Sequence, residues 1–471
     1  MSVLVVGAGP AGLVTAITLG RLGIRTVVVE RRSTPSGLPR ATGVSLRSVE
    51  IIRSWGLEQR LRAGEIDVGT TSWMGGPPAT GQGAAGSLGF PTPEQARRVS
   101  PTTAVSAPQD HLEPVLLAHL RTLPAVQVRF GTELVSLDQD DEGVRVVLRA
   151  EAGLTTERFR FVVGADGAHS AVRASVGIPM EGPDDLGAYY TVTFHAPLAE
   201  RLPRPRHGLY LVAHPEAGGI LLPTDNVDRW VFAQPYDPAT QRPLEYSTRR
   251  LTGLIRAASG VPDVPVRVTR VGVFTFAAQV AERYRAGNVF LAGDAAHRTT
   301  PRGATGMNTA IQDGYGLAWR LAWVLRGWAD QCLLDTYERE RRPVGARNTM
   351  RSADAAGTRD NSQDWLDDLG GRVAHAWVAP GVSTLDLIGP GLTLLTGPAG
   401  RPWLQAVAEL DPRVPVEVRG VDAEAAAALG IGRDGAVLVR PDAIPVATWS
   451  TVDPAALADA IAMTALEPAA C

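Results

Sequence analysis

The 471-residue chain contains no lysine and only two cysteines, and both shortages exclude functions. Since all 46 basic residues are arginines, any side-chain cation that recognises a phosphate must be an arginine. Cys332 and Cys471 are too few for a disulfide framework, a CxxC redox pair or a cysteine-based zinc site, and we expect no metal centre. The most apolar predicted helix carries Arg320 and Arg326, which makes it a core helix and not a membrane span.

The chain also lacks a large excess of charge of either sign. Its formal net charge is −3, so nothing points to nucleic acid or to an anionic membrane as a partner. The length favours about two or three domains with ample core. The first strand is expected to begin near Val3, which leaves no room for a signal peptide, so we expect a soluble, cytoplasmic protein.

The first thirty residues contain a pattern typical of dinucleotide-binding proteins. Residues Val3–Val6 form an apolar run, as in a parallel strand buried on both faces, and a Gly-x-Gly-x-x-Gly motif follows. Gly7 makes a tight turn, Gly9 admits a pyrophosphate to the backbone, and Gly12 lets helix and strand touch. Glu30 ends the next predicted strand and can accept hydrogen bonds from an adenosine ribose. The motif does not choose between NAD and FAD, and the alternative is a glycine-rich turn in an ordinary βαβ unit.

A second stretch, residues 288–308, predicts a ligand with hydroxyl groups and an electron-poor ring. It indicates a strand over Val289–Ala292 and then a turn that carries Asp294. A loop rich in glycine and proline follows, and a helix then runs from about Asn308 to Arg326. The carboxylate would bind a sugar-like chain, and the helix N-terminus would favour negative charge on a ring system. A flavin has both parts, whereas a tight turn that merely packs a helix on a sheet leaves the acid unexplained.

Four motifs occur in an order that resembles the single-component flavoprotein aromatic hydroxylases, the family of para-hydroxybenzoate and phenol hydroxylases. Within that family, the chain is most similar to the branch that oxygenates polyketides and related natural products. The matching stretches are Gly7 to Glu30, Arg40–Ala41 with Arg47–Gly56, Gly164–Arg173, and Gly293–Asn308.

The resemblance implies an α/β fold in three parts. A Rossmann-like FAD-binding domain in two segments, residues 1–180 and 279–355, would enclose a mainly antiparallel β-sheet substrate domain at residues 181–278. Apolar residues in that insertion alternate with period two, as a sheet requires. Residues 381–471 resemble a thioredoxin-like α/β domain, and without a CxxC motif it would serve packing or a homo-oligomer. Residues 75–93 are rich in glycine and predict a mobile loop, either over the substrate entrance or simply on the surface.

The resemblance also implies roles for individual residues. Arg40 would lie near the isoalloxazine ring, the Pro301 carbonyl would face the reaction zone, and Gln109 would contact the ribityl chain. The residues expected to bind the cofactor are Gly7, Gly9, Pro10, Ala11, Gly12, Glu30, Arg31, Arg40, Gln109, Asp166, Gly293, Asp294, Pro301, Gly306, Met307 and Asn308. The expected catalytic positions are Arg40, Pro301 and Gly303. The expected substrate-lining residues are Tyr190, Tyr210 and Trp230, from a wider set that adds Tyr189, His214 and Gln234.

The chemistry implied by the resemblance is aromatic hydroxylation. NADPH or NADH would reduce bound FAD transiently, and the reduced flavin would capture O2 as a C4a-hydroperoxide that hydroxylates a small-molecule aromatic substrate of polycyclic polyketide type. A Baeyer–Villiger or epoxidising monooxygenase would use the same fold and remains an alternative. A flavin-dependent halogenase is disfavoured because the expected Gly-Trp-x-Trp-x-Ile-Pro stretch is missing. A flavin-binding protein without turnover is the rival from a different class.

Overall fold

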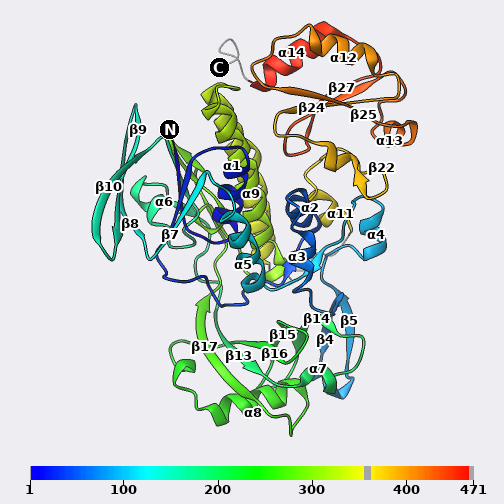
Figure 1. Ribbon diagram of the computed structural model, residues 1–471. Helices are drawn as coiled ribbons and strands as arrows, with labels where there is room; N and C mark the ends of the chain where they lie inside the picture. Colours follow the sequence, from blue (N-terminus) through cyan, green and yellow to red (C-terminus); the bar gives the residue numbers. More distant parts are fainter. Residues whose placement is uncertain (1, 355–361, 466–471) are drawn as a thin grey trace.

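The computed structural model describes residues 2–354 and 362–465. They form three units, each built from a β-sheet and helices (Figure 1). A core with a six-stranded sheet contains both halves of the predicted cofactor domain. A seven-stranded sheet lies below this core, and a four-stranded C-terminal unit lies to its upper right. None of the helices in the described ranges combines the length and apolarity that crossing a bilayer requires.

The six-stranded sheet has the order β19-β20-β11-β1-β2-β7, and all neighbours are parallel except β19 and β20. Its inner strands are short apolar runs buried on both faces, as predicted for a parallel sheet. The strands are β1 (Val3–Val6), β2 (Thr26–Glu30), β7 (Val126–Phe130), β11 (Phe161–Gly164), β19 (Arg285–Ala286) and β20 (Val289–Leu291).

Two helices, α1 (Pro10–Arg21) and α9 (Gly306–Leu325), pack against each other in this core. Their close approach depends on Gly314, where a Cβ atom would lie 2.5 Å from the Ala11 carbonyl oxygen. A glycine inside a helix costs roughly 1 kcal/mol relative to alanine, and here the contact between the two helices requires it. The N-terminal ends of both helices are therefore held in one rigid unit.

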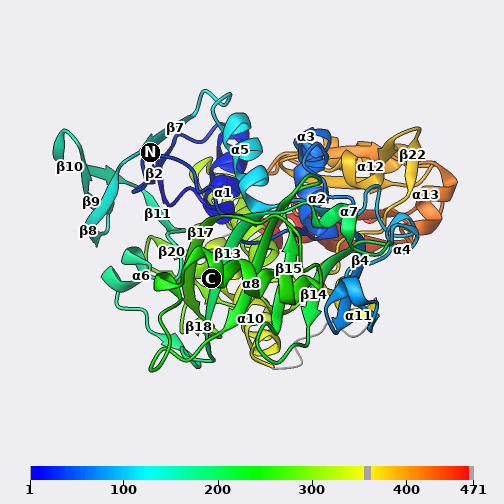
Figure 2. The same ribbon diagram turned by 90° about the horizontal axis from the view of Figure 1, so that it is seen from below.

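The seven-stranded sheet has the order β17-β13-β16-β15-β14-β4-β5, and all its pairs are antiparallel except β14 with β4. Helix α8 (Thr248–Ser259) packs on the face away from the cofactor core, as Figures 1 and 2 both show. The strands are β4 (Gly69–Gly75), β5 (Gly83–Ser87), β13 (Ala188–His195), β14 (His207–Val212), β15 (Gly219–Pro223), β16 (Arg229–Pro235) and β17 (Arg267–Thr275).

Strand β5 corrects the expectation of a loop over residues 75–93. Its glycines suggested a loop, but the segment pairs with β4 at the edge of the sheet. Glycine has no side chain to pack, and an edge strand tolerates this because only one neighbour depends on it. The inserted unit joins the core through a small antiparallel sheet of β12 (Met180–Glu181), β18 (Gln279–Ala281) and β21 (His297–Arg298).

The C-terminal unit contains a four-stranded sheet with the order β25-β24-β26-β27. Strands β24 and β25 are parallel, and the other two pairs are antiparallel. The arrangement is a mixed α/β unit, as expected, and the thioredoxin-like label stays a prediction. Its elements are β24 (Leu392–Thr396), α12 (Arg401–Ala408), β25 (Val416–Gly420), α13 (Ala423–Ala428), β26 (Ala436–Val439), β27 (Pro445–Trp449) and α14 (Pro454–Ala465).

The remaining elements surround the three sheets. The helices are α2 (Leu46–Ser54), α3 (Glu58–Arg62), α4 (Pro93–Arg97), α5 (Gln109–Leu120), α6 (Ala171–Ser175), α7 (Leu198–Arg201), α10 (Asp335–Ala353) and α11 (Ser362–Asp367). The strands are β3 (Gly43–Val44), β6 (Val105–Ser106), β8 (Glu133–Asp140), β9 (Gly143–Ala150), β10 (Gly153–Phe159), β22 (Trp377–Ala379) and β23 (Val382–Ser383).

Candidate functional site

The turn between β1 and α1 has the geometry that a pyrophosphate needs. Gly7 has a φ of +106°, and a Cβ atom there would lie 2.2 Å from the Ala165 carbonyl oxygen. A Cβ atom at Gly12 would lie 2.0 Å from the Gly7 carbonyl oxygen, whereas one at Gly9 would have no atom within 4 Å. No side chain caps the α1 N-terminus, where Pro10 is the first residue. Open space beside Gly9 and uncapped N–H groups together favour an anion at this turn.

Glu30, at the end of β2, is a buried and ionised acceptor. Its Oε2 accepts a hydrogen bond from the Ala8 N–H at 3.1 Å, and its Oε1 accepts one from the Arg32 N–H at 3.0 Å. Burial alone would raise the pKa of Glu30, but the hydrogen bonds from Arg32 and Ala8 outweigh it and hold that pKa below its usual range. Arg31, which was also expected to bind the cofactor, is exposed just beyond the strand.

Asp294 is an exposed carboxylate in an otherwise buried segment. Residues 291–297 are buried except for this acid, which lies in the 3-10 helix η3 (Gly293–Ala295) after β20. Surrounding protein atoms displace water and raise the pKa of Asp294, even though part of its surface stays accessible; nearby cations oppose the shift. A Cβ atom at Gly293 would lie 3.1 Å from the Ala11 Cβ, so this turn lies against the first turn of α1. The two predicted cofactor-binding turns are therefore adjacent.

A buried ion network holds the Asp294 turn from behind, and the sequence analysis did not predict it. The Asp313 Oδ2 lies 2.6 Å from the His297 Nε2 and accepts the Gly293 N–H at 3.3 Å. Its Oδ1 accepts a hydrogen bond from the Arg341 Nε at 2.8 Å. Burial would raise the pKa of Asp313, but Arg341 and His297 hold it below its usual range. An acid at a core-facing position of the predicted helix was the available signal, since an unpaired charge is rarely buried there.

The loop before α9 leads into a second uncapped helix N-terminus. Pro301 is exposed, Gly303 has a φ of +76°, and the adjacent Ala304 also has a positive φ of +51°. Thr305 is the N-cap of α9, and no side-chain hydrogen bond caps the helix. Gly306 begins the helix, with Met307 buried behind it. This end of the helix offers a positive dipole end to a negatively charged ring.

Asn308 uses its whole side chain to hold other parts of the protein. Its Oδ1 accepts the Ser45 N–H at 2.8 Å, and its Nδ2 donates to the carbonyl oxygens of Gly43 and Ala304 at 3.0 Å each. A role for Asn308 toward a cofactor must therefore use its backbone, as the family resemblance implies. The exposed Arg40 lies just before the segment that Asn308 holds.

The side chains of Gln109 and Asp166 are both held by hydrogen bonds within the protein. The Gln109 Nε2 donates one hydrogen to the Glu113 Oε1 at 2.7 Å, so its carbonyl oxygen and its second N–H are left for a ligand. Burial raises the pKa of Glu113. Asp166 accepts hydrogen bonds from the Ser170 hydroxyl at 2.5 Å and the Val172 N–H at 3.1 Å, and burial raises its pKa. It braces the start of α6, and its role toward the cofactor stays a prediction.

The predicted substrate-lining residues lie on the wrong face of the seven-stranded sheet. Tyr190, Tyr210 and Trp230 are 2%, 1% and 2% exposed and belong to the core between the sheet and α8. A substrate between the sheet and the cofactor core cannot touch them, so we correct this assignment. Aromatic side chains at period two mark a buried face but do not identify which one.

The opposite face, called here the open face, points to the loop before α9. Tyr189 lies on it and stacks on Phe276 with ring centroids 4.1 Å apart, and the Arg302 Cζ lies 5.4 Å from the Phe276 centroid. Arg229 on the same face forms an ion pair with Asp110 in the first turn of α5. The partly exposed residues of the open face are Thr191, Thr193, Leu209, Leu211, Ile220, Leu222, Val231 and Gly272.

Two family models match this chain over most of its length. A model described as FAD binding domain matches residues 1–352, and one described as aromatic-ring hydroxylase, C-terminal, matches residues 367–468. The chain belongs to the FAD-binding aromatic-ring hydroxylases. The family and the mixed α/β fold class predicted from the sequence are confirmed, with FAD as the cofactor of this hydroxylase family.

The relatives of this chain include proteins named for polyketides. It is 43% identical over 357 residues to a protein named as a polyketide hydroxylase, from Streptomyces halstedii, which covers 74% of this chain and 64% of that protein. It is 35% identical over 520 aligned positions to aklavinone 12-hydroxylase RdmE of Streptomyces purpurascens, which covers 97% of this chain and 96% of that protein. A solved ternary complex of aklavinone-11 hydroxylase with FAD and aklavinone has a TM-score of 0.88 and 32% identity, with 99% of each chain covered. The chain thus spans less than two thirds of the length of the Streptomyces halstedii protein. It spans nearly all of RdmE and of aklavinone-11 hydroxylase.

Proposed function

We propose that this chain is an FAD- and NAD(P)H-dependent monooxygenase that hydroxylates an aromatic substrate of the polycyclic polyketide type. The observation that carries the proposal is the meeting of two uncapped helix N-termini at one exposed acid, Asp294. Nearly end-to-end similarity to aklavinone hydroxylases supports the substrate class.

The residues of this site suit each part of FAD. The turn at Gly7–Gly12 would hold the pyrophosphate, and Glu30 would accept hydrogen bonds from the adenosine ribose. Asp294 and Gln109 would bind the hydroxyl groups of the flavin side chain, and the α9 N-terminus would stabilise negative charge on the pyrimidine ring. When bound and reduced by NAD(P)H, FAD supplies the activation of O2. Arg40 would help to hold the ring, and the backbone from Pro301 to Gly303 would border the reaction zone.

The open face supports an aromatic substrate rather than a small polar one. Its leucine, isoleucine and valine side chains offer an apolar surface, and the Tyr189–Phe276 stack adds an aromatic wall beside the loop before α9. Flat rings bind well to such walls because stacking adds to the burial of apolar area. A sheet face that excludes water also protects a reactive oxygen species from release.

The test begins with the colour of the purified protein. A yellow protein that releases FAD on denaturation is expected, and it should consume NAD(P)H faster when polycyclic phenols or quinones are added. Mass spectrometry should then find products with one added oxygen and an unchanged ring count. A lactone would support Baeyer–Villiger oxidation instead. A yellow protein that consumes no NAD(P)H with any ligand would favour the non-catalytic rival.

Several broader properties belong to the same proposal. The cofactor domain would comprise residues 1–180 and 279–355, the substrate domain residues 181–278 and the C-terminal domain residues 381–471, although β4 and β5 add residues 69–87 to the substrate sheet. A cytoplasmic location would give the enzyme access to NAD(P)H, and the C-terminal domain could serve a homo-oligomer. Cell fractionation and light scattering test these two points.

A further inference from the structure

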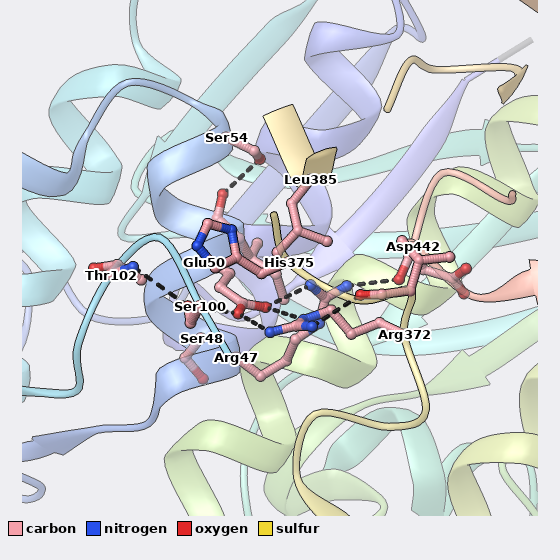
Figure 3. Close-up of polar contacts among 12 residues, drawn as sticks. Arg47, Ser48, Glu50, Ser54, Ser100, Thr102, Arg372, His375, Leu385 and Asp442 are labelled. Carbon is pink, nitrogen blue, oxygen red and sulfur yellow. Dashed lines mark hydrogen bonds and ion pairs between the residues drawn. The ribbon is translucent and has the colours of Figure 1, made fainter. Parts of the chain in front are cut away.

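A fully buried carboxylate joins the cofactor core to the segment that leads into the C-terminal domain. Glu50, on α2, and Arg372 both have side chains that are 3% exposed. The Arg372 guanidinium donates from Nη2 to the Glu50 Oε1 at 2.6 Å and from Nε to Oε2 at 2.9 Å (Figure 3). The Ser100 hydroxyl donates to Oε1 at 2.8 Å, and the Arg47 Nη1 donates to Oε2 at 3.0 Å. Each carboxylate oxygen of Glu50 therefore accepts two hydrogen bonds, and a buried carboxylate requires such partners.

A second contact ties the same helix to the C-terminal sheet. The Arg47 Nη2 donates to the Asp442 carbonyl oxygen at 2.6 Å, and Asp442 lies in the turn between β26 and β27 (Figure 3). The Asp442 carboxylate accepts from the Trp319 Nε1 at 3.2 Å and pairs with Arg440. Helix α2 is thus fixed from the C-terminal side through Glu50 and Arg47, and Arg53 near its end adds hydrogen bonds to the Gly381 carbonyl oxygen and the Asp386 carboxylate.

The N-terminal end of α2, next to Arg47, carries the segment beside the predicted flavin site. Ser45 is its N-cap and donates its N–H to Asn308 at the start of α9, and Gly43 accepts from the same side chain. The carbonyl oxygen of Ala41 accepts the Gln109 N–H at 2.7 Å. Arg40 therefore lies next to a short backbone stretch that is held at one end by cofactor-site residues and at the other by α2.

We propose that Glu50 and Arg372 are positioning residues that let the C-terminal domain set the place of the Arg40 segment relative to the flavin. The constraint reaches the Arg40 segment through α2, because residues within three turns of one helix cannot move independently of each other. This inference rests on the proposed function, since Arg40 acts in it as a flavin neighbour. Without the pair, α2 would keep its helical structure and the contacts of Arg47 and Arg53 but would be held less firmly, and the segment 40–46 would open more often.

The experiment compares substitutions in the pair with a matched control in the full-length FAD-bound protein. Arg372→Met and Glu50→Gln remove the ion pair, and Arg372→Lys keeps the charge without the two-pronged hydrogen bonding. The control is Arg285→Met, because the Arg285 side chain is largely buried and pairs with Asp335, and its hydrogen bonds stay within the cofactor core, away from α2. The readouts are amide hydrogen exchange of the peptide covering residues 40–46, the rate of FAD dissociation, and the hydrogen peroxide released per NAD(P)H consumed.

In Arg372→Met and Glu50→Gln we expect exchange over residues 40–46 to accelerate about tenfold and FAD to dissociate at least about threefold faster. Arg372→Lys should recover part of both effects. Arg285→Met should leave exchange at 40–46 unchanged. Equal acceleration in the control, or unchanged exchange in both pair variants, would overturn the proposal. Exchange and FAD release need no turnover, so a protein that hydroxylates nothing defeats the proposed function and leaves this test decisive.

If the pair variants do not fold, Arg47→Met replaces them. It keeps the hydrogen bonds between Glu50 and Arg372 and removes those of Arg47 to Glu50 and Asp442, and we expect the same direction with a smaller, about threefold, change. Increased hydrogen peroxide release in a folded variant would extend the result to catalysis. A variant with faster exchange and unchanged peroxide release would overturn the claim that the anchored segment matters for the flavin.

Discussion

In the six-stranded sheet the residues that we propose for the cofactor stand at the ends of strands, whereas in the seven-stranded sheet we propose a whole face for the substrate. The end of β1 continues into the Gly7–Gly12 turn, and Glu30 and Asp294 follow β2 and β20. Parallel strands bring their carboxyl ends to one edge of the sheet. These groups would therefore contact a ligand that binds at that edge. In the seven-stranded sheet, by contrast, function depends on which face α8 covers.

Amino-acid substitutions should therefore act differently in the two sheets. At the strand ends, backbone geometry sets function, so a single added methyl group decides between folding and failure. On the sheet, stability and binding are divided between two faces, and adjacent residues along one strand serve different purposes. The aromatic face against α8 belongs to the core, and the aliphatic open face is the surface that we propose for the substrate.

The largest effect is expected at the strand ends, where two glycines of one motif should fail in different ways. Gly7→Ala should destabilise the fold by more than about 3 kcal/mol, because the methyl group meets the Ala165 backbone and the positive φ disfavours alanine. Gly9→Ala should fold normally, since no atom lies near its Cβ, but should lose FAD because the pyrophosphate needs that space. Thermal unfolding and the FAD content of purified protein measure both. Normal folding of Gly7→Ala would contradict the comparison.

The two faces of the sheet should separate stability from binding in neighbouring residues. Trp230→Ala should cost about 3–5 kcal/mol of unfolding free energy, because it opens a cavity in the core under α8. Val231→Ala, one residue along on the open face, should cost about 1 kcal/mol and change substrate KM more than Trp230→Ala does. Urea unfolding and steady-state kinetics measure the two effects. Similar losses of stability in both variants would remove the distinction between the faces.

This contrast also explains which parts of the molecule can be predicted from the sequence. The strand at Val289–Leu291 and the helix at Gly306–Leu325 were predicted to within about two residues, because glycine, proline and helical periodicity are local signals. The position of Glu30 followed from spacing along one βαβ unit. These features need no knowledge of how distant segments meet.

The parts that failed depend on contacts between distant segments. Tyr190 and Tyr189 are adjacent, and nothing local says that α8 would cover the first and leave the second toward the cofactor core. The support of the Asp294 turn by Asp313 involves Arg341, which comes from a helix later in the chain. Asn308 likewise holds a segment that is 263 residues away along the chain. Such pairs are set by tertiary packing, which overrides local patterns.

A bulky side chain on the open face should weaken substrate binding without lowering stability, which is the reverse of the effect expected for Trp230→Ala. Leu222→Trp should raise the substrate KM or Kd about tenfold while changing the melting temperature little, because it fills ligand space and not core. Val227→Trp in the adjacent exposed loop is the matched control, and it should leave substrate binding unchanged. Equal effects of the two tryptophans would place the substrate elsewhere.

The smallest effect concerns pH and again separates the two faces. Burial against α8 raises the pKa of Tyr190 to about 12, and its hydroxyl donates to the Gln234 Oε1. Because the folded pKa lies above the unfolded value of about 10, the stabilisation is complete below pH 10 and is lost as the pH rises from 10 to 12. Tyr190→Phe should cost about 1 kcal/mol at pH 8, the value of one hydrogen bond. Its disadvantage should shrink or reverse by pH 12, since phenylalanine cannot ionise. Urea unfolding at pH 8, 10 and 11 measures this, with Phe232→Leu as the control whose loss of stability stays constant. If the difference between Tyr190→Phe and the unsubstituted protein also stays constant, the tyrosine hydroxyl is not sealed beneath α8.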